Sequence, residues 1–383
     1  MRILFIDTVS RMGGAQWSLL ELAVRFSGQG MEPCAAVPEG PLAEKLRAAG
    51  IRVYTLPLFR PRRTAALTVR VRGIVALFVC AWRLLGIVRA AKVDLLYANS
   101  LAAATLVSLL PFRKPLVWHV RDLNLAPRMA HRAARRAQRI IAASQAIDEH
   151  LCELLPRDTL GRIKLVMNGI DTARFAPADR TAARQALGLP VDAPVIGMLA
   201  HMVPWKRHDQ FLRVAAQVKA RHPSARFVLA GQDLFGEHAA WIARLRAQAQ
   251  KANLESSLLW IDCAEDTAPV IAALDVLVHP PVDEPFGRVL CEAMAMQVPV
   301  VAMDKAGPSG IVADGETGLL ALPREPNQLA EKTLDLLADP LLARRMGAAG
   351  RKRVLAHFNA DRTASQAAAV CREALAAYRS ERA

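Results

Sequence analysis

The stretch VLVHPPVDEPFGRVLCEAM, residues 276–294, is the part of the sequence that indicates the fold most clearly. Its opening aliphatic run at 276–278 predicts a short buried strand. A proline-rich loop follows, and helical spacing of apolar residues begins near Gly287. A strand, a loop and a helix in this order form half of the unit that is repeated in parallel α/β sheets.

Strand-like and helix-like patterns alternate along the rest of the chain. This alternation predicts parallel sheets with right-handed crossover connections. We expect an α/β protein made of two Rossmann-like, doubly wound domains that face each other across a cleft. The expected strands lie at 3–7, 33–37, 53–56, 94–98, 116–120, 140–143 and 164–167 in the first half, and at 195–199, 227–230, 258–261, 276–278, 299–303 and 319–322 in the second.

The length of 383 residues suits two domains of ordinary size. The turn signal at 168–171 is followed by a polar stretch that we interpret as a linker ending at Pro194. We therefore expect one domain at 1–180 and a second at 190–358. From Pro323 onward the pattern is helical and ends in an alanine-rich helix at 360–379.

Composition excludes several classes of protein. Hydrophobic residues make up 53% of the chain and aromatic residues 5%, so the cores must consist of Ala, Leu and Val. The six cysteines are scattered along the sequence, a pattern that indicates neither a disulfide framework nor a zinc site. We therefore expect no metal and no cofactor. We also expect a reducing, cytoplasmic location. The longest uncharged apolar run, 73–82, is far shorter than a membrane span, and the N-terminus has no signal-peptide pattern.

The formal net charge of +15 concerns the partners of the protein. Three partners compete as explanations: an anionic membrane, a nucleic acid, and an anionic substrate. The segment 62–92 mixes arginines with apolar residues in a partly amphipathic pattern, which suits attachment at the inner face of a cytoplasmic membrane. The alternative is an ordinary helix packed on the sheet with solvated arginines. No nucleic-acid motif is present, so we expect no nucleic-acid partner.

Three loops that follow expected strands can hold a ligand, because open α/β sheets bind ligands at the carboxyl ends of their strands. The first contains Gly13 and Gly14, where the backbone can approach a ligand closely, although two glycines also suit a plain tight turn. The second is 279–292, and the third is 201–208.

The loop within 279–292 carries two glutamates eight positions apart. Backbone N–H groups at the start of the following helix, near Gly287, can receive a phosphate. Glu292 lies about 1.4 turns into that helix, where its carboxylate can reach ribose hydroxyls. Glu284 precedes the helix and would face a sugar. The alternative is that Glu284 caps the helix and Glu292 is a solvated surface residue.

The loop at 201–208 places Lys206 after the first strand of the second half. A cation there can stabilise a departing diphosphate and take the place of a metal ion. The alternative is a solvated basic start of a helix.

On these motifs the chain resembles the large retaining family of glycosyltransferases with the GT-B fold, family 4. The resemblance runs from Gly13-Gly14 to the end of the second half. It implies a nucleotide-sugar donor held by the second domain, an acceptor held by the first, and a final helix, 360–383, that packs back on the first domain. The motifs that carry it are VMNGID at 166–171, PWK at 204–206, LAG at 229–231, EPFG at 284–287 and DGETGLL at 314–320.

The resemblance also implies roles by position. Glu292 should bind the donor ribose, Glu284 the transferred sugar, and Lys206 the diphosphate together with Gly13 and Gly14. His119, at the end of a first-domain strand, matches a position near the reacting sugar, although a structural role is its alternative; Arg121 and Asp122 are its neighbours. The expected catalytic residues are His119, Lys206 and Glu284, and the expected donor-binding residues also include His201, Arg207, Phe286, Gly287 and Arg288.

Two departures from the family pattern concern charge. Ala200-His201 stands where the family usually has Gly-Arg, so a cation is replaced by a residue that is only partly charged at neutral pH. Arg207 stands where a glycine is usual and could supply charge from a shifted position. Gly310 takes the place of a frequent glutamate in a loop that touches the donor.

The function that we expect is transfer of a hexose from UDP- or GDP-sugar to a glycan or lipid-linked acceptor in cell-surface polysaccharide or glycolipid synthesis. By the resemblance, the leaving diphosphate accepts the acceptor's proton in a front-side displacement. The alternatives are a non-catalytic partner protein that keeps the fold, and a nucleotide-sugar epimerase. An acceptor requirement distinguishes transfer from epimerisation.

Overall fold

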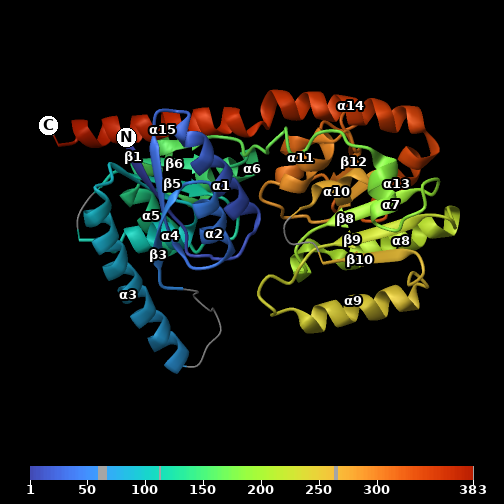
Figure 1. Ribbon diagram of the computed structural model, residues 1–383, viewed down its shortest axis with the longest axis horizontal. Helices are drawn as coiled ribbons and strands as arrows, with labels where there is room; N and C mark the ends of the chain where they lie inside the picture. The colour runs from blue at the N-terminus through green and yellow to red at the C-terminus, as the bar shows by residue number, and fades with distance from the viewer. Residues whose placement is uncertain (59–66, 112–113, 263–265, 383) are drawn as a thin grey trace. The chain divides into compact units, whose positions relative to one another are not determined.

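The computed structural model describes residues 1–58, 67–111, 114–262 and 266–382, with the side chains of helix α3 described from residue 75 onward. The chain forms two compact units: unit 1 is Met1–Gly169 with Ala360–Ala383, and unit 2 is Ile170–Asn359 (Figure 1). The last helix, α15 (Ala360–Ser380), is therefore part of unit 1.

Unit 1 is built on a parallel sheet whose strands, within the described residues, follow the order β3-β2-β1-β4-β5-β6-β7. The order reverses between β1 and β4, which pair directly, and this is the switch point where doubly wound sheets bind ligands. The strands are β1 (Arg2–Ile6), β2 (Glu32–Pro38), β3 (Arg52–Leu56), β4 (Leu95–Ala98), β5 (Leu116–Val120), β6 (Arg139–Ala142) and β7 (Ile163–Leu165).

Helices cover both faces of this sheet. Leu4 and Ile6 of β1 pack on one face with α3 to α6, and Ile3 and Phe5 pack on the other with α1, α2 and α15. This two-sided burial explains why the strands are almost continuously apolar. The helices are α1 (Gly14–Ser27), α2 (Pro41–Ala48), α3 (Leu67–Ala91), α4 (Leu101–Val107), α5 (Pro127–Arg136), α6 (Gln145–Leu154) and the 3-10 helix η1 (Arg157–Arg162).

Unit 2 repeats the design with a parallel sheet in the order β10-β9-β8-β11-β12-β13 in its described part. Its strands are β8 (Val195–Leu199), β9 (Arg226–Ala230), β10 (Leu258–Ile261), β11 (Val276–His279), β12 (Val300–Met303) and β13 (Leu319–Ala321). Its helices are α7 (Arg180–Ala186), η2 (Pro204–Lys206), α8 (His208–Arg221), α9 (Ala239–Lys251), α10 (Ala268–Ala272), α11 (Arg288–Ala295), α12 (Gly307–Ile311), α13 (Gln328–Ala338) and α14 (Pro340–His357).

The fold class is confirmed: both halves are doubly wound parallel sheets, and every expected strand is present with ends that differ by at most two residues. No helix in the part of the chain that the structure describes has both the length and the apolar character needed to cross a membrane.

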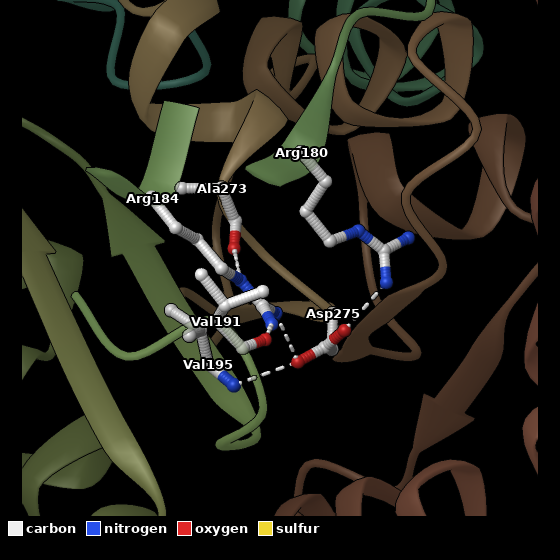
Figure 2. A network of polar contacts seen from close by, with 6 residues as sticks. All are labelled: Arg180, Arg184, Val191, Val195, Ala273 and Asp275. Carbon is white, nitrogen blue, oxygen red and sulfur yellow. Dashed lines mark hydrogen bonds and ion pairs between the residues drawn. The ribbon is translucent and has the colours of Figure 1, made fainter. Parts of the chain in front are cut away.

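The interpretation of residues 171–194 as a linker is wrong, because this segment is folded into unit 2. Phe175 is almost completely buried, and α7 is anchored through two arginines. Figure 2 shows Asp275, just before β11, accepting hydrogen bonds from Arg180 Nη1 at 2.7 Å and Arg184 Nη2 at 2.6 Å. The expected boundary at 180 thus falls at the start of a helix that belongs to unit 2, and unit 1 ends at Gly169.

The same network holds the amino end of the unit 2 sheet. Arg184 is buried and also donates to two backbone carbonyls, from Nε to Ala273 O at 3.0 Å and from Nη1 to Val191 O at 2.5 Å (Figure 2). The backbone N–H of Val195, the first residue of β8, donates to Asp275 Oδ2 at 2.7 Å. The hydrogen bonds around the buried guanidinium of Arg184 thus satisfy two carbonyls, the Asp275 carboxylate and, through that carboxylate, the N–H of Val195.

Candidate functional site

The loop between β11 and α11 has a backbone that only glycine adopts readily at its end. Gly287 lies in the left-handed region with φ 99° and precedes the first turn of α11. Gly287 is the N-cap of this helix, and no side-chain cap hydrogen bond is made within the described part of the chain, so the interpretation of Glu284 as a helix cap is wrong. The first N–H groups of α11 remain the natural site for an anion.

Glu284 is a buried carboxylate held between two donors. Lys206 Nζ forms an ion pair with Glu284 Oε2, and His279 Nε2 lies 3.2 Å from the same oxygen. Burial by itself raises the pKa of Glu284, but the charge of Lys206 and the hydrogen bond from His279 outweigh it and hold the pKa at about 2. Glu284 is therefore ionised at neutral pH and can accept hydrogen bonds from hydroxyl groups.

The partners of Glu284 come from two neighbouring strands. His279 ends β11, and burial lowers its pKa, so it is neutral and uses Nε2–H as the donor. Lys206 ends η2, after β8, and its Nζ also lies 4.1 Å from the centroid of the Trp205 ring. Because β8 and β11 pair directly, both loops emerge at the same edge of the sheet.

Glu292 is buried on α11 and not a solvated surface residue, so that alternative is wrong as well. Its Oε1 accepts a hydrogen bond from Arg288 Nε at 3.1 Å, and its Oε2 lies 3.3 Å from Thr267 Oγ1. Arg288 and Glu292 form an i,i+4 pair on one side of the helix. A carboxylate held in this way is pre-positioned for a ligand with paired hydroxyls.

His201 carries no charge at neutral pH. Burial, followed by the charge of Lys206, lowers its pKa to about 4. The cation that the family has at this position is therefore absent and not merely weakened. Arg207 adopts a left-handed backbone with φ 58°, which glycine would adopt without strain and which costs an L-residue about 1 kcal/mol.

The loop after β12 interlocks with the loop before α11. The N–H of Gly307 donates to the carbonyl of Glu284 at 2.8 Å, and a Cβ atom on Gly307 would lie 2.2 Å from Phe286 O. Phe286 packs against Phe358 with ring centroids 6.0 Å apart, so its ring serves the packing of unit 2. A Cβ atom on Gly310 would meet no described atom within 4 Å, so close packing does not require glycine at this position.

In unit 1 the polar residues that follow the strands form a buried network. His119 Nδ1 lies 2.6 Å from Tyr97 Oη and 3.2 Å from Arg121 Nη2, and both of these groups donate to it. Burial, followed by the charge of Arg121, lowers the pKa of His119 well below its usual value. His119 is thus neutral with its proton on Nε2, which has no hydrogen-bond partner among the described residues.

The network extends from Arg121 to the switch point of the sheet. Arg121 donates from Nε to Asn99 Oδ1 at 2.6 Å and from Nη1 to Asn168 Oδ1 at 2.7 Å. Asn99 in turn donates to Asp7 Oδ2 at 2.7 Å, and burial raises the pKa of Asp7. Sequence reasoning missed Asp7, Tyr97, Asn99 and Asn168, although Asp7 and Asn99 stand at the carboxyl ends of expected strands, where polar residues are informative.

The expected glycine loop belongs to unit 1 as well. Gly13 is the residue before α1, with φ −112°, which is a backbone conformation open to any residue. Its N–H donates to Gln16 Oε1 at 3.2 Å, and Gln16 Nε2 donates to Asp7 Oδ2 at 3.1 Å. Gly14 is the first residue of α1. The loop is therefore connected to the same polar network as His119.

The structure brings the expected residues together in two groups. Unit 2 holds Lys206, Glu284 and His279 in direct contact, and beside them the pair Arg288 and Glu292. Unit 1 holds the second group, of Gly13, Gly14 and His119 with Arg121. Among the described residues, no group of three or more His, Cys, Asp or Glu side chains is arranged to hold a metal ion.

Two family models match the chain in succession. Residues 12–174 match the model described as Glycosyltransferase Family 4, and residues 179–353 match Glycosyl transferases group 1. The first half of the chain thus resembles glycosyltransferase family 4, and the second half resembles glycosyl transferases of group 1. The resemblance expected from the motifs is thereby confirmed, and the second match contains Lys206, Glu284 and Glu292.

Relatives and solved structures agree with this resemblance. D-inositol 3-phosphate glycosyltransferase 2 of Catenulispora acidiphila is 34% identical over 209 residues, which are 53% of this chain and 49% of that protein. The chain thus spans about half the length of the curated relatives that it matches. The crystal structure of Anabaena Alr3699/HepE in complex with UDP-glucose has a TM-score of 0.83 and 25% identity, covering 96% of this chain and 98% of that one.

A more distant structure supports the fold alone. Sucrose-phosphate synthase of Thermosynechococcus elongatus has a TM-score of 0.83 at 22% identity, covering 98% of this chain and 100% of that one.

Proposed function

We propose that this chain is a retaining glycosyltransferase that moves a hexose from a UDP- or GDP-linked donor to a glycan or lipid-linked acceptor. The observation that carries the proposal is Glu284, a buried carboxylate kept ionised by Lys206 and His279 directly before an uncapped helix. An ionised carboxylate beside helix N–H groups suits a ligand that has hydroxyls next to a diphosphate.

The donor is expected to divide its groups among the residues of unit 2. Its diphosphate would take the N–H groups at the start of α11 and the ammonium of Lys206. Glu284 would accept hydrogen bonds from the sugar, and Glu292 from the ribose. Lys206 would then exchange part of its contact with Glu284 for the diphosphate, which an ammonium on a flexible stem can do at small cost.

The chemical step is a displacement at the anomeric carbon. The bond from this carbon to the diphosphate oxygen breaks, a bond to the acceptor oxygen forms on the same face, and the acceptor's proton passes to the departing diphosphate. Lys206 and the helix N–H groups stabilise the charge that develops on the diphosphate. Since this stabilisation comes from the chain, transfer should persist in EDTA; its loss, with recovery on added Mg²⁺, would contradict a metal-independent reaction.

UDP-glucose is the first donor to examine, because a similar structure was solved in complex with it. Thermal unfolding with UDP, GDP and ADP and their sugars should give stabilisation by one base, since ligands that bind the folded state raise its apparent stability. Glu292→Ala should abolish that stabilisation. Transfer of labelled hexose to candidate acceptors, inositol 3-phosphate among them, then distinguishes an enzyme from a non-catalytic partner protein. The neutral His201 is the observation that favours the non-catalytic alternative.

We further propose that the acceptor is reached at an anionic membrane surface in polysaccharide or glycolipid synthesis. Val75, Phe78, Val79 and Trp82 recur at helical spacing on α3 and are all exposed, Phe78 by 64% and Trp82 by 74%. The opposite side of α3 already packs into the core. The exposed apolar row is therefore not explained by packing on the sheet.

Charge supports the same interpretation. α3 contains no acidic residue over its 25 residues, and Arg83 and Arg89 are exposed beside the apolar row. An apolar row with flanking arginines suits the interface of an anionic bilayer. Arg62 and Arg63, at the start of the expected basic segment 62–92, lie outside the described residues.

Vesicle flotation tests this surface separately from donor binding. The full chain should float with vesicles of phosphatidylcholine and phosphatidylglycerol more than with phosphatidylcholine alone. Phe78→Ser with Trp82→Ser should reduce recovery, while Val24→Ser, at an exposed apolar residue on α1, should not. Equal recovery of all proteins, or with both lipids, would contradict the membrane proposal and leave the donor proposal unaffected.

A further inference from the structure

A second charged cavity lies in unit 1, away from every residue considered above. It has a volume of about 420 Å³ and is lined by Arg132, Arg135, Arg136 and Arg162 together with Ser108 and Glu381. Ser108 follows α4, which leads into β5; Arg136 ends α5, which leads into β6; and Arg162 directly precedes β7. The cavity is therefore at the edge of the sheet where strands begin, opposite to the edge of His119 and Asn99.

The sequence of α5 explains the convergence of arginines. Arg132, Arg135 and Arg136 are spaced i, i+3 and i+4 toward the carboxyl end of α5 and so project from one side of the helix. Arg162 arrives from η1 and donates from Nη1 to Ala137 O at 2.9 Å, just beyond the end of α5. The carboxyl end of a helix favours cations, which accounts for some of this charge but not for the cavity.

The partners of these arginines differ from those of other arginines in unit 1. Arg2, Arg25 and Arg47 each form an ion pair with a carboxylate at 2.5 to 2.7 Å. In contrast, Arg132 and Arg162 donate to backbone carbonyls, which are neutral: Arg132 Nη2 lies 3.2 Å from Ser108 O.

Carboxylates compensate the cavity only weakly. Arg135 Nε lies 3.9 Å from Asp158 Oδ2, and both side chains are mostly exposed. Glu381 is exposed in the turn after α15. The cavity therefore keeps a net positive charge.

We propose that this cavity binds a phosphate-bearing ligand, as a second anion site independent of the donor site. Guanidinium groups present paired N–H donors that match the oxygens of a phosphate. The carbonyl contacts hold Arg132 and Arg162 in place before a ligand arrives, which lowers the entropic cost of binding. The volume lies within the range of about 300 to 1,000 Å³ that is common for small-ligand sites.

Pyrophosphate is the first probe, measured by calorimetry on the full chain carrying Lys206→Gln, which weakens the proposed diphosphate site in unit 2. Adding Arg132→Gln and Arg135→Gln should weaken pyrophosphate binding by about tenfold or more, because hydrogen bonds to charged groups are lost. Arg157→Gln is the matched control: it removes one exposed charge from η1 without touching the cavity, and it should change binding less than about twofold.

A thermal scan accompanies each variant, and Arg135→Gln alone replaces the double change if that variant does not fold. The proposal would be overturned if Arg132→Gln with Arg135→Gln left the affinity for pyrophosphate unchanged. It would also be overturned if Arg157→Gln reduced that affinity equally, because the effect would then come from diffuse surface charge. If pyrophosphate does not bind, vesicles with phosphatidylglycerol provide the second arm. Recovery that depends on Arg132 and Arg135 identifies a lipid headgroup as the source of the phosphate, and binding of neither probe overturns the proposal.

Discussion

Two carboxylates stand at the two ends of the same strand, β11: the partly buried Asp275 and the buried Glu284. Asp275 precedes the strand and accepts hydrogen bonds from Arg180, Arg184 and the N–H of Val195. Glu284 follows the strand and faces Lys206 and His279. Both carboxylates pair with cations, but the cations beside them are held in different ways.

The difference lies in the cations. The guanidinium of Arg184 is fixed by two backbone carbonyls in addition to Asp275, so its donors are committed to the fold. Lys206 has a single ammonium group, lies at the end of a 3-10 turn and contacts the face of the Trp205 ring. A fixed, fully bonded pair stabilises a fold, whereas an exchangeable pair next to an uncapped helix suits ligand binding.

Breaking the fixed pair should have the largest effect on stability. Arg184→Met leaves the partly buried Asp275 with one cation fewer and leaves two carbonyls without a donor, so the free energy of unfolding should fall by about 2 to 3 kcal/mol. Urea denaturation measures this change. Arg213→Met on α8 is the control for removal of an arginine side chain from unit 2. An unfolding midpoint equal to that of the unchanged chain would contradict the structural role.

Breaking the exchangeable pair should affect transfer more than stability. Lys206→Gln removes the cation proposed to stabilise the leaving diphosphate, so kcat should fall by about 100- to 1,000-fold. Steady-state assays with a saturating donor measure this, with Arg180→Gln as the control because it removes a cation at the other end of β11. A loss of unfolding free energy as large as that of Arg184→Met, without a change in kcat, would reverse the two assignments.

The neutrality of His201 should be visible in the acid stability of the protein. Its folded pKa of about 4 lies below the ordinary value of 6.5, so the unfolded chain binds the proton more readily. This residue therefore lowers stability as pH falls from about 6.5 to 4. His201→Asn should flatten the dependence of the unfolding free energy on pH in that window, and an unchanged slope would show that His201 is not buried as described.

The smallest expected effect concerns the orientation of His119. Tyr97→Phe removes one of two donors to Nδ1 and leaves Arg121 to hold the tautomer, so kcat/KM should fall by about fivefold, equivalent to one hydrogen bond. His119→Ala measured in parallel gives the full contribution of the ring. Equal losses in both variants would mean that Arg121 does not orient the ring.

The fold could be predicted from the sequence because the strand-like and helix-like patterns that indicate it are both local. Strand runs such as 116–120 and 195–199 coincide with β5 and β8, since two-sided burial makes a strand apolar along almost its whole length. The segment 171–194 was misinterpreted because the residue that holds it in unit 2, Asp275, is distant in the sequence. Arg184 and Asp275 are 91 residues apart, and neither looks unusual in its own neighbourhood.

The site could be predicted only as far as residue identity and spacing reach. The positions of Lys206, Glu284 and Glu292 follow from motifs, and in the structure the two glutamates are buried. The protonation of His201 and His119 depends on burial and on neighbours from other strands, and the packing of Phe286 depends on Phe358, 72 residues further along the chain. Such properties arise from tertiary contacts that no local pattern encodes.

Donor binding at the carboxyl end of β11 can be measured by calorimetric titration of the full chain with UDP-glucose and GDP-mannose, with Glu284→Gln and Lys206→Gln beside the control Arg180→Gln. We expect one donor to bind the unchanged chain and the control alike, and each of the other two variants to bind it about tenfold more weakly or worse. Equal binding in all four proteins, or loss of binding in the control alone, would contradict the assignment of donor binding to the carboxyl end of β11.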